Sequence, residues 1–368
     1  MLAVLTGGGT AGHINPALAL AEALQDEGWE VRYAGTPGGV EARLVPQAGI
    51  GFTPFEAAGF NRSHPTTLPK ALLTLAASTR KAKAWLAEIK PDAVVGFGGY
   101  VSIPVGRAAT QLGIPLVLHE QNSVMGLANK QLAPKAACTC LTYEGTTRVP
   151  ASATVRVTGN PVRKSVFAAT REEGRRAFNI PEDALMLLVT GGSLGARHIN
   201  QAMTALKDRL LAYDKLYVVH VCGPKEYDTV REALGLNPEE AKRWHVYGYT
   251  NQMGLAMAAC DAIVSRAGAT SLAEIAARAI PALLVPFPYA TEDHQTTNAK
   301  SCVEAGAAFM LPDESVESER FAELLCQLIE DAGLRERMAQ AARAQKAQDA
   351  CGLLREAVEQ AAKQAPRR

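Results

Sequence analysis

The sequence predicts an α/β protein with two domains, each a parallel β-sheet wrapped by helices. Short β-rich apolar runs that end in glycine or polar residues alternate with longer helical stretches, the pattern of strand-helix-strand crossovers. The 368 residues exceed what one hydrophobic core usually serves, so two domains of about 150 to 200 residues are expected. An internal echo also suggests two similar halves, because residues 6–15 read TGGGTAGHIN and residues 190–200 read TGGSLGARHIN.

The expected strands are the short apolar runs. In the first half they span residues 2–6, 30–34, 93–97, 115–119, 137–142 and 153–158. In the second half they span residues 185–190, 216–222, 244–248, 261–265 and 282–286. Between them, Ala, Leu, Glu, Lys and Arg recur at helical spacing, which predicts crossover helices such as 16–27 and 271–279.

The domain boundary is expected at the tripeptide Gly159-Asn160-Pro161. This gives a first domain over residues 1–160 and a second over residues 161–340. The stretch after Glu330 is long, charged and rich in alanine, which predicts one or two terminal helices. We expect the last of them, within residues 341–368, to pack back toward the first domain.

Composition excludes several classes of protein. Lys and Arg number 38 against 37 Asp and Glu, so no global charge favours nucleic acid as a partner. No run of 18 apolar residues occurs, and the first strand enters a glycine loop at once, so neither a membrane span nor a secretion signal is expected. The cysteines are odd in number and lack a C-x-x-C pair, which predicts a reducing cytoplasm without disulfides or zinc; they are residues 138, 140, 222, 260, 302, 326 and 351.

The first glycine loop has the spacing G-x-G-x-x-G of dinucleotide-binding domains. Such domains also need an acid at the end of the second strand, but that strand ends in Gly35 and Thr36, with Glu41 lying beyond Pro37-Gly38-Gly39. An oxidoreductase is therefore disfavoured. With Asn15 as N-cap and Pro16 as first helical residue, His13 would lie at the loop tip. It either serves the chemistry or only braces its loop.

Other expected strands also end in polar or glycine-rich loops. In the first half these loops contain Gly98-Gly99-Tyr100 and His119-Glu120-Gln121-Asn122, and in the second half GGSLGAR, SRAGATS and EDHQ. Ligands of open α/β sheets bind at such edges, so a ligand cleft between the domains is expected. Ser271 and Glu274 also have the spacing of a capping box, so Glu274 either stabilises a helix start or reaches a sugar hydroxyl.

Six segments together resemble the MurG family, the bacterial UDP-N-acetylglucosamine transferases of peptidoglycan synthesis. They are GGGTAGHINPALALAEAL, GGYVSIPVGRAA, HEQNSVMGLANK, TGNPVR, GGSLGARHIN and SRAGATSLAEIAARAIPALLVPFP. The resemblance runs from Leu2 to about Ala350. It implies the GT-B fold, two Rossmann-like domains whose parallel sheets face each other across a cleft. It also implies transfer of N-acetylglucosamine from UDP to the C4 hydroxyl of the muramoyl sugar of lipid I, giving lipid II with inversion.

The resemblance also implies roles for individual residues. His13 is the candidate base, since imidazole exchanges a proton near neutral pH, and Glu120 is the weaker alternative. The donor would be held by Thr10, Ala11, Gly12, Asn122, Arg163, Ser193, Thr250, Ala269, Thr270, Ser271, Leu272, Ala273, Glu274 and Gln295. Glu274 would bind the ribose and Gln295 the sugar hydroxyls. The acceptor-side loops would contain Gly98, Gly99, Tyr100 and Ser102. No D-x-D motif is found, and no cofactor or metal is implied.

Two positions depart from the family pattern. Thr250, beside the uracil, stands where the family more often has isoleucine, and the run Asp293-His294-Gln295 replaces a Gln-Gln pair of some relatives. Backbone contacts to uracil could survive the first change.

A lipid-linked acceptor would bring the enzyme to the cytoplasmic face of the membrane. Residues 61–90 contain Arg62, Lys70, Arg80, Lys81, Lys83 and Lys90 against Glu88 alone. They also contain Leu68, Leu72, Leu73, Leu75 and Trp85. A basic, partly apolar surface of this kind can lie on anionic lipid, although a routine crossover helix would explain most of the apolar residues.

Two other interpretations remain open. One is another GT-B enzyme, either a UDP-sugar transferase with a different acceptor or a UDP-sugar 2-epimerase. The other is a non-catalytic subunit that binds a nucleotide sugar and presents it to a partner.

Overall fold

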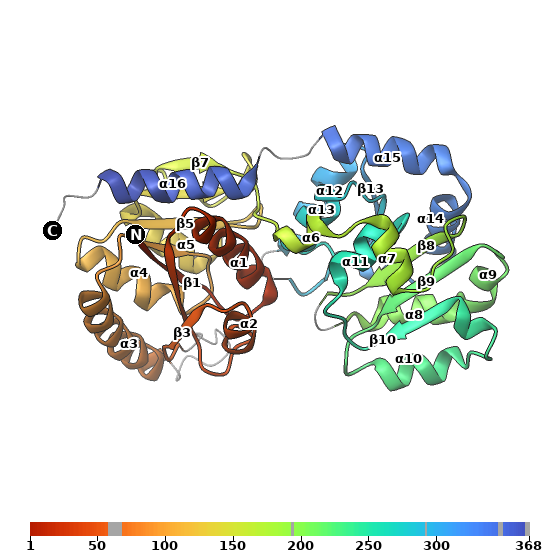
Figure 1. Ribbon diagram of the computed structural model, residues 1–368, viewed down its shortest axis with the longest axis horizontal. Coiled ribbons are helices and arrows are strands. Elements are labelled where there is room, and N and C mark those ends of the chain that lie inside the picture. The colour runs from red at the N-terminus through yellow and green to blue at the C-terminus, as the bar shows by residue number, and fades with distance from the viewer. Residues whose placement is uncertain (58–67, 193–194, 291–292, 345–348, 365–368) are drawn as a thin grey trace. The chain divides into compact units, whose positions relative to one another are not determined.

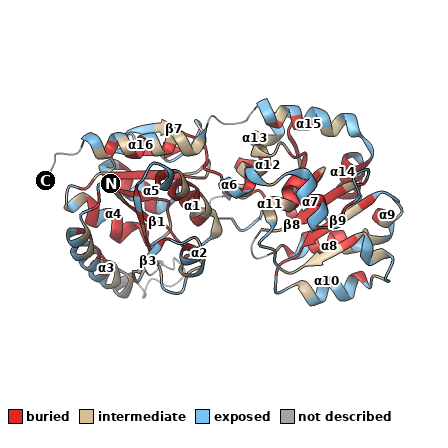
Figure 2. Ribbon diagram, in the orientation of Figure 1, coloured by how far each residue is buried: buried red, intermediate tan, exposed pale blue. Residues whose placement is uncertain are grey.

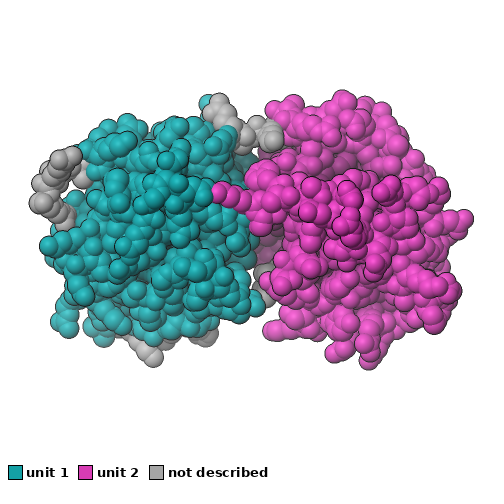
Figure 3. All heavy atoms as spheres, viewed as in Figure 1, with its two compact units in different colours: residues 1–163, 347–368 teal, residues 164–346 magenta. Residues whose placement is uncertain are grey.

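The computed structural model describes residues 1–57, 68–192, 195–290, 293–344 and 349–364, with side chains of the helix that begins at residue 68 described from residue 71. The chain divides into two compact units (Figure 3). The first contains residues 1–163 and 347–368, and the second contains residues 164–346. Residues 161–163, expected in the second domain, thus belong to the first unit.

The first unit is built on a seven-stranded parallel sheet with the strand order β3-β2-β1-β4-β5-β6-β7 (Figure 1). The strands are β1 (Leu2–Thr6), β2 (Glu30–Gly35), β3 (Gly51–Pro54), β4 (Ala93–Gly96), β5 (Leu116–Glu120), β6 (Cys138–Leu141) and β7 (Val155–Val157). The helices are α1 (Ala11–Asp26), α2 (Glu41–Gln47), α3 (Leu68–Ile89), α4 (Ser102–Gln111), α5 (Leu127–Leu132) and α16 (Ala350–Gln364). The central strands are continuous apolar runs because helices cover both faces of a parallel sheet.

The C-terminal helix α16 belongs to the core of the first unit. Its residues Leu354, Ala357, Val358 and Ala361 are buried in the same cluster as residues of α1, β1 and β4. Figure 2 shows the common pattern, with buried central strands and exposed outer faces on the helices.

The second unit contains a six-stranded parallel sheet with the order β10-β9-β8-β11-β12-β13. The strands are β8 (Leu185–Thr190), β9 (Leu216–Val221), β10 (Trp244–Tyr247), β11 (Ala262–Ser265), β12 (Ala282–Leu284) and β13 (Ala308–Met310). The helices are α6 (Lys164–Ala168), α7 (Arg171–Ala177), α8 (Arg197–Ala205), α9 (Lys207–Leu211), α10 (Tyr227–Leu234), α11 (Met253–Ala259), α12 (Ala269–Ala277), α13 (His294–Glu304), α14 (Glu319–Glu330) and α15 (Ala332–Ala344).

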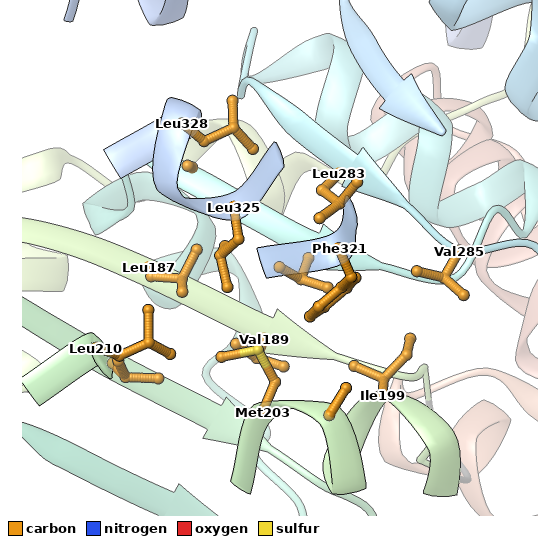
Figure 4. Packing of buried hydrophobic residues seen from close by; sticks show 14 of the residues in the cluster. Leu187, Val189, Ile199, Met203, Leu210, Leu283, Val285, Phe321, Leu325 and Leu328 are labelled. Atoms are coloured by element: carbon orange, nitrogen blue, oxygen red, sulfur yellow. The ribbon is translucent and has the colours of Figure 1, made fainter. Parts of the chain in front are cut away.

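One face of this second sheet packs against α8 and α14. Leu187 and Val189 of β8 lie between Met203 of α8 and the α14 residues Phe321 and Leu325 (Figure 4). The helix α14 presents an apolar stripe at helical spacing, which is why it docks on the sheet.

The strand order reverses once in each sheet. In the first unit the reversal lies between β1 and β4, and in the second between β8 and β11. Ligands of doubly wound sheets bind at the carboxyl ends of the strands beside such a switch point. The loops that follow these four strands are therefore the first places to look for a site.

The predicted fold class, two Rossmann-like parallel sheets with C-terminal helices, is confirmed, but two predicted helix starts are wrong. Gly9, at a φ of 91°, completes the turn early, so α1 begins at Ala11 with Thr10 as N-cap. Pro16 therefore lies inside α1. Helix α12 begins at Ala269 with Gly268 as N-cap.

The short edge strands β3 and β13 were not predicted. In the part of the chain that the structure describes, no helix has both the length and the hydropathy required to span a bilayer.

Candidate functional site

Two loops meet at the switch point of the first sheet. One contains Gly7 to Thr10 after β1, and the other contains Gly98 to Val101 after β4. A Cβ at Gly99 would lie 2.5 Å from the carbonyl oxygen of Gly8, so only glycine permits this approach. The two predicted loops of the first domain are thus brought into direct contact.

His13 lies where these loops meet, in the first turn of α1 rather than at the loop tip. Its Nδ1 is 2.9 Å from the carbonyl oxygen of Gly8. Because a carbonyl can only accept, Nδ1 carries the proton and Nε2 is left as a proton acceptor. A Cβ at Gly98 would lie 3.3 Å from Nε2, so the imidazole rests against the backbone of the second loop.

Glu120, the alternative base, is buried and surrounded by donors. Its Oε1 accepts from the backbone and side-chain nitrogens of Asn122, at 3.1 and 3.3 Å. Its Oε2 accepts from the Gly126 nitrogen at 3.0 Å and from Asn129 Nδ2 at 2.9 Å. With both oxygens committed to four N–H groups, the geometry favours a carboxylate that holds its own loop over one that takes a substrate proton.

The neighbouring His119 stays neutral. Its Nε2 donates to the carbonyl of Gly159 at 2.9 Å, and its Nδ1 lies 3.0 Å from the Gln121 side-chain amide. Burial lowers the pKa of His119 to about 4, with the Gly159 hydrogen bond opposing. This contact joins the end of β5 to the segment that contains Arg163.

The other residues predicted for the acceptor side differ in their burial. Ser102 is buried, with its Oγ 2.6 Å from the carbonyl oxygen of Gly98, so it supports the loop from within. Tyr100 is 48% exposed and presents an aromatic side chain in the loop beyond the carboxyl end of β4.

Arg163 belongs to the first unit, where it forms an ion pair with Glu22 of α1. Its Nε and Nη2 both lie 3.0 Å from Glu22 Oε1. The structure therefore groups Arg163 with α1, which carries His13.

The second switch point contains the largest group of predicted donor residues, the six from Ala269 to Glu274 at the start of α12. Leu272 is 3% exposed and belongs to the core, while Ser271, Ala273 and Glu274 are partly exposed along α12. Because the helix starts at Ala269, Ser271 is its third residue, and the capping-box interpretation of Ser271 and Glu274 is wrong. Glu274 instead lies one turn further along the helix.

Gln295 links two loops of this unit. Its side-chain oxygen accepts from the backbone nitrogens of Ala267, at 3.2 Å, and Phe287, at 3.0 Å. Thr250 Oγ1 accepts from the Gln252 nitrogen at 3.0 Å, in the loop before α11. Ser193 lies outside the described residues.

An ion network beside α12 was missed by sequence reasoning. Asp313 accepts from Arg266 Nη1 at 2.5 Å and from His198 Nδ1 at 2.6 Å, and the same Arg266 nitrogen also donates to the carbonyls of Val285 and Pro286. Asp313 comes from the segment after β13, a strand that was not predicted.

Glu41 was considered only as an acid too far along the chain to bind a dinucleotide. In the structure its carboxylate is buried under the first glycine loop, where it accepts from the Gly9 nitrogen at 3.3 Å. Its partner Gly9 lies 32 residues away in the sequence, so no local pattern marked this contact.

The strand ends at the two switch points differ in their chemistry. The first presents His13, whose Nε2 is able to accept a proton, and the second presents the N-terminus of α12, which favours an anion such as a diphosphate. Within the described ranges, no group of three or more His, Cys, Asp or Glu side chains could hold a metal ion.

Comparisons with known proteins agree with this arrangement. Residues 3–140 match the glycosyltransferase family 28 N-terminal domain, and residues 186–354 match the C-terminal domain of that family. Two relatives, from Halothermothrix orenii and Salinibacter ruber, are both named UDP-N-acetylglucosamine–N-acetylmuramyl-(pentapeptide) pyrophosphoryl-undecaprenol N-acetylglucosamine transferase. The first is 40% identical, with 93% of this chain and 94% of the relative covered; the second is 41% identical, with 94% and 93% covered.

A crystal structure of Acinetobacter baumannii MurG is also similar, with a TM-score of 0.76 and 31% identity, covering 98% of this chain and 99% of that one. The similarity identifies the fold as GT-B. Since the two family models together span most of the sequence, and relatives of about 40% identity cover nearly all of it, the chain belongs to glycosyltransferase family 28.

Proposed function

We propose that the chain transfers N-acetylglucosamine from UDP-N-acetylglucosamine to the C4 hydroxyl of the muramoyl sugar of lipid I. The product is lipid II, with the configuration at the transferred sugar inverted. The observation that carries the proposal is His13, whose Nε2 is left as a proton acceptor at the first switch point. It occurs in a chain whose relatives, about 40% identical over nearly their full length, bear the name of this reaction.

In this proposal the acceptor hydroxyl gives its proton to His13 Nε2 while its oxygen attacks the anomeric carbon. The bond from that carbon to the diphosphate breaks, and UDP leaves with the electron pair. The residues Thr10, Ala11, Gly12 and Asn122 lie near the transferred sugar, and Gly98, Gly99, Tyr100 and Ser102 shape the acceptor side. A base near the hydroxyl and positive character near the diphosphate are what a single displacement requires.

The nucleotide is assigned to the second unit. The N-terminus of α12, from Ala269 and Thr270, stabilises the diphosphate through its dipole and backbone N–H groups. Glu274 accepts from the ribose hydroxyls, Thr250 lies beside the uracil, and Gln295 keeps its loops in place while its amide nitrogen faces the sugar. Ser193 is assigned to the diphosphate as well, and Arg163, a residue of the first unit, remains a predicted diphosphate contact.

The test is a panel of UDP-sugars offered with a short-chain lipid I analogue. We expect disaccharide product with UDP-N-acetylglucosamine and little with UDP-glucose or UDP-galactose. Product only with another acceptor would favour a different GT-B transferase. Binding of UDP-N-acetylglucosamine without turnover on any acceptor would favour the non-catalytic subunit.

We also propose that the enzyme works at the cytoplasmic face of the membrane, with residues 61–90 against anionic lipid. The supporting observation is α3, where Leu72 is 56% and Leu73 is 72% exposed. Arg80, Lys81 and Lys83 on the same helix are also exposed. Trp85 instead packs on Phe55, 5.4 Å between ring centroids, so it belongs to the core side of α3. Residues 61–67, including Arg62, lie outside the described residues.

Sedimentation with lipid vesicles tests this surface. At low salt we expect binding to phosphatidylglycerol vesicles but not to phosphatidylcholine vesicles, and release as salt rises, since surface charges are screened. Replacing Arg80 and Lys83 with Gln should weaken binding several-fold. Lys215→Gln, at an exposed lysine of the second unit, is the matched control. Vesicle binding that did not change with salt concentration or lipid charge would contradict the electrostatic account.

A further inference from the structure

We propose that Glu41 is a positioning residue for His13, acting through the peptide group between Gly8 and Gly9. The carboxylate holds the N–H of this peptide, and the imidazole of His13 donates to its C=O. The inference deepens the proposed function and rests on His13 as the base of that reaction.

The Glu41 carboxylate is buried and satisfied by three donors. Oε1 accepts from the backbone nitrogen of Thr36 at 3.0 Å and from Thr36 Oγ1 at 2.5 Å. Oε2 accepts from the Gly9 nitrogen at 3.3 Å. A carboxylate is costly to bury unless such donors surround it, so its place under the loop calls for a reason beyond filling space.

The glycines of the first unit are arranged around this side chain. A Cβ at Gly8 would overlap the carboxylate, and a Cβ at Gly35 would lie 2.6 Å from Glu41 Cγ. The side chain thus occupies space that three glycines leave open: Gly8 in the loop after β1, Gly35 at the end of β2, and Gly39 just before α2. An apolar side chain could fill that space but could not accept from Gly9.

The connection to His13 is a single peptide plane. The carbonyl oxygen of Gly8, which accepts from His13 Nδ1 at 2.9 Å, and the nitrogen of Gly9 belong to the same peptide group. In a trans peptide the N–H and C=O point in opposite directions, so Glu41 and His13 hold the plane from its two sides. A charged acceptor on the N–H also strengthens the carbonyl as an acceptor.

A peptide between two glycines needs such an anchor. Gly9 has a φ of 91°, and glycine populates positive and negative φ about equally, so this plane has little intrinsic preference. If the plane turned over, an N–H would face Nδ1, and the opposite tautomer, with the proton on Nε2, would be favoured. Glu41 therefore keeps Nε2 as the atom that accepts the substrate proton.

Glu41→Gln tests this action of Glu41 on His13, because glutamine has nearly the same shape as glutamate. Its amide oxygen can stay with Thr36, but its NH₂ group then faces the Gly9 N–H. By ¹⁵N NMR of histidine-labelled protein, we expect the wild-type His13 to carry its proton on Nδ1 and the variant to show a mixture of tautomers. We expect kcat to fall about 10-fold or more, with the KM for UDP-N-acetylglucosamine within about 2-fold. Glu30→Gln, at an exposed pair with Arg32, is the matched control and should change neither.

Two results would overturn the inference. One is a folded Glu41→Gln variant with wild-type tautomer and kcat. The other is a wild-type His13 with its proton on Nε2, a measurement that needs no variant and so stands even if Glu41→Gln fails to fold. The tautomer is read without turnover. A wild-type protein that makes no disaccharide would therefore refute the proposed function separately.

Discussion

The two glycine loops that echo each other in sequence place similar residues in different chemical settings. In both, an isoleucine of the shared His-Ile-Asn run is fully buried: Ile14 in α1 and Ile199 in α8. The histidines before them differ in their partners. His13 Nδ1 meets the backbone carbonyl of Gly8, whereas His198 Nδ1 meets the carboxylate of Asp313.

The asparagines differ as well. Asn200 is buried, with its Oδ1 2.9 Å from His220 Nε2 and its Nδ2 donating to the Cys222 carbonyl at 2.9 Å. Asn15 is only partly buried. Burial also lowers the pKa of His220 to about 3, so this imidazole is a neutral part of the core.

The repeated run thus marks a shared packing unit and not a shared chemical role. The buried isoleucine and the helix start recur because both loops must turn a strand into a helix. The polar residues around them have different partners in the two units. In the first unit the histidine binds a backbone carbonyl through Nδ1, and in the second the histidine joins a network with Asp313 and Arg266.

The largest expected effect comes from replacing His13 with alanine, and His198→Ala in the second loop is the comparison. His13→Ala should lower kcat by about 100-fold or more, because it removes the proposed base. His198→Ala should leave kcat within about 3-fold, since an exposed partner of Asp313 contributes little. Steady-state kinetics with the lipid I analogue measures both. An equal loss in the two variants would mean that neither histidine is the base.

Much of the fold followed from the sequence because central parallel strands are continuous apolar runs between polar loops. Strands such as β1, β4 and β8 were predicted nearly to the residue for this reason. The short edge strands β3 and β13 have weak patterns, since only a few residues pair on one side. The predicted starts of α1 and α12 were wrong because the sequence offers favourable capping residues inside both helices. Asn15 and Ser271 are such residues, but the glycine turns start the helices earlier, at Ala11 and Ala269.

Candidate site residues were predicted where a loop carries many unusual residues together, as around His13 and Glu274, and their roles stay predictions. Glu41 and Asp313 were not predicted, because each is an isolated acid whose partner lies far along the chain. Gly9 lies 32 residues from Glu41, and His198 lies 115 residues from Asp313. Only tertiary structure brings these pairs together, so no local pattern marks them.

The proposed function divides the reaction between the two units, with proton transfer in the first and nucleotide binding in the second. Isothermal titration of UDP into His13→Ala and Glu274→Ala tests it most directly. We expect Glu274→Ala to weaken UDP binding about 10-fold or more, because a charge-assisted hydrogen bond to the ribose is lost, and His13→Ala to leave it within about 2-fold. Weaker UDP binding in His13→Ala, with Glu274→Ala unchanged, would place the nucleotide in the first unit and contradict the account.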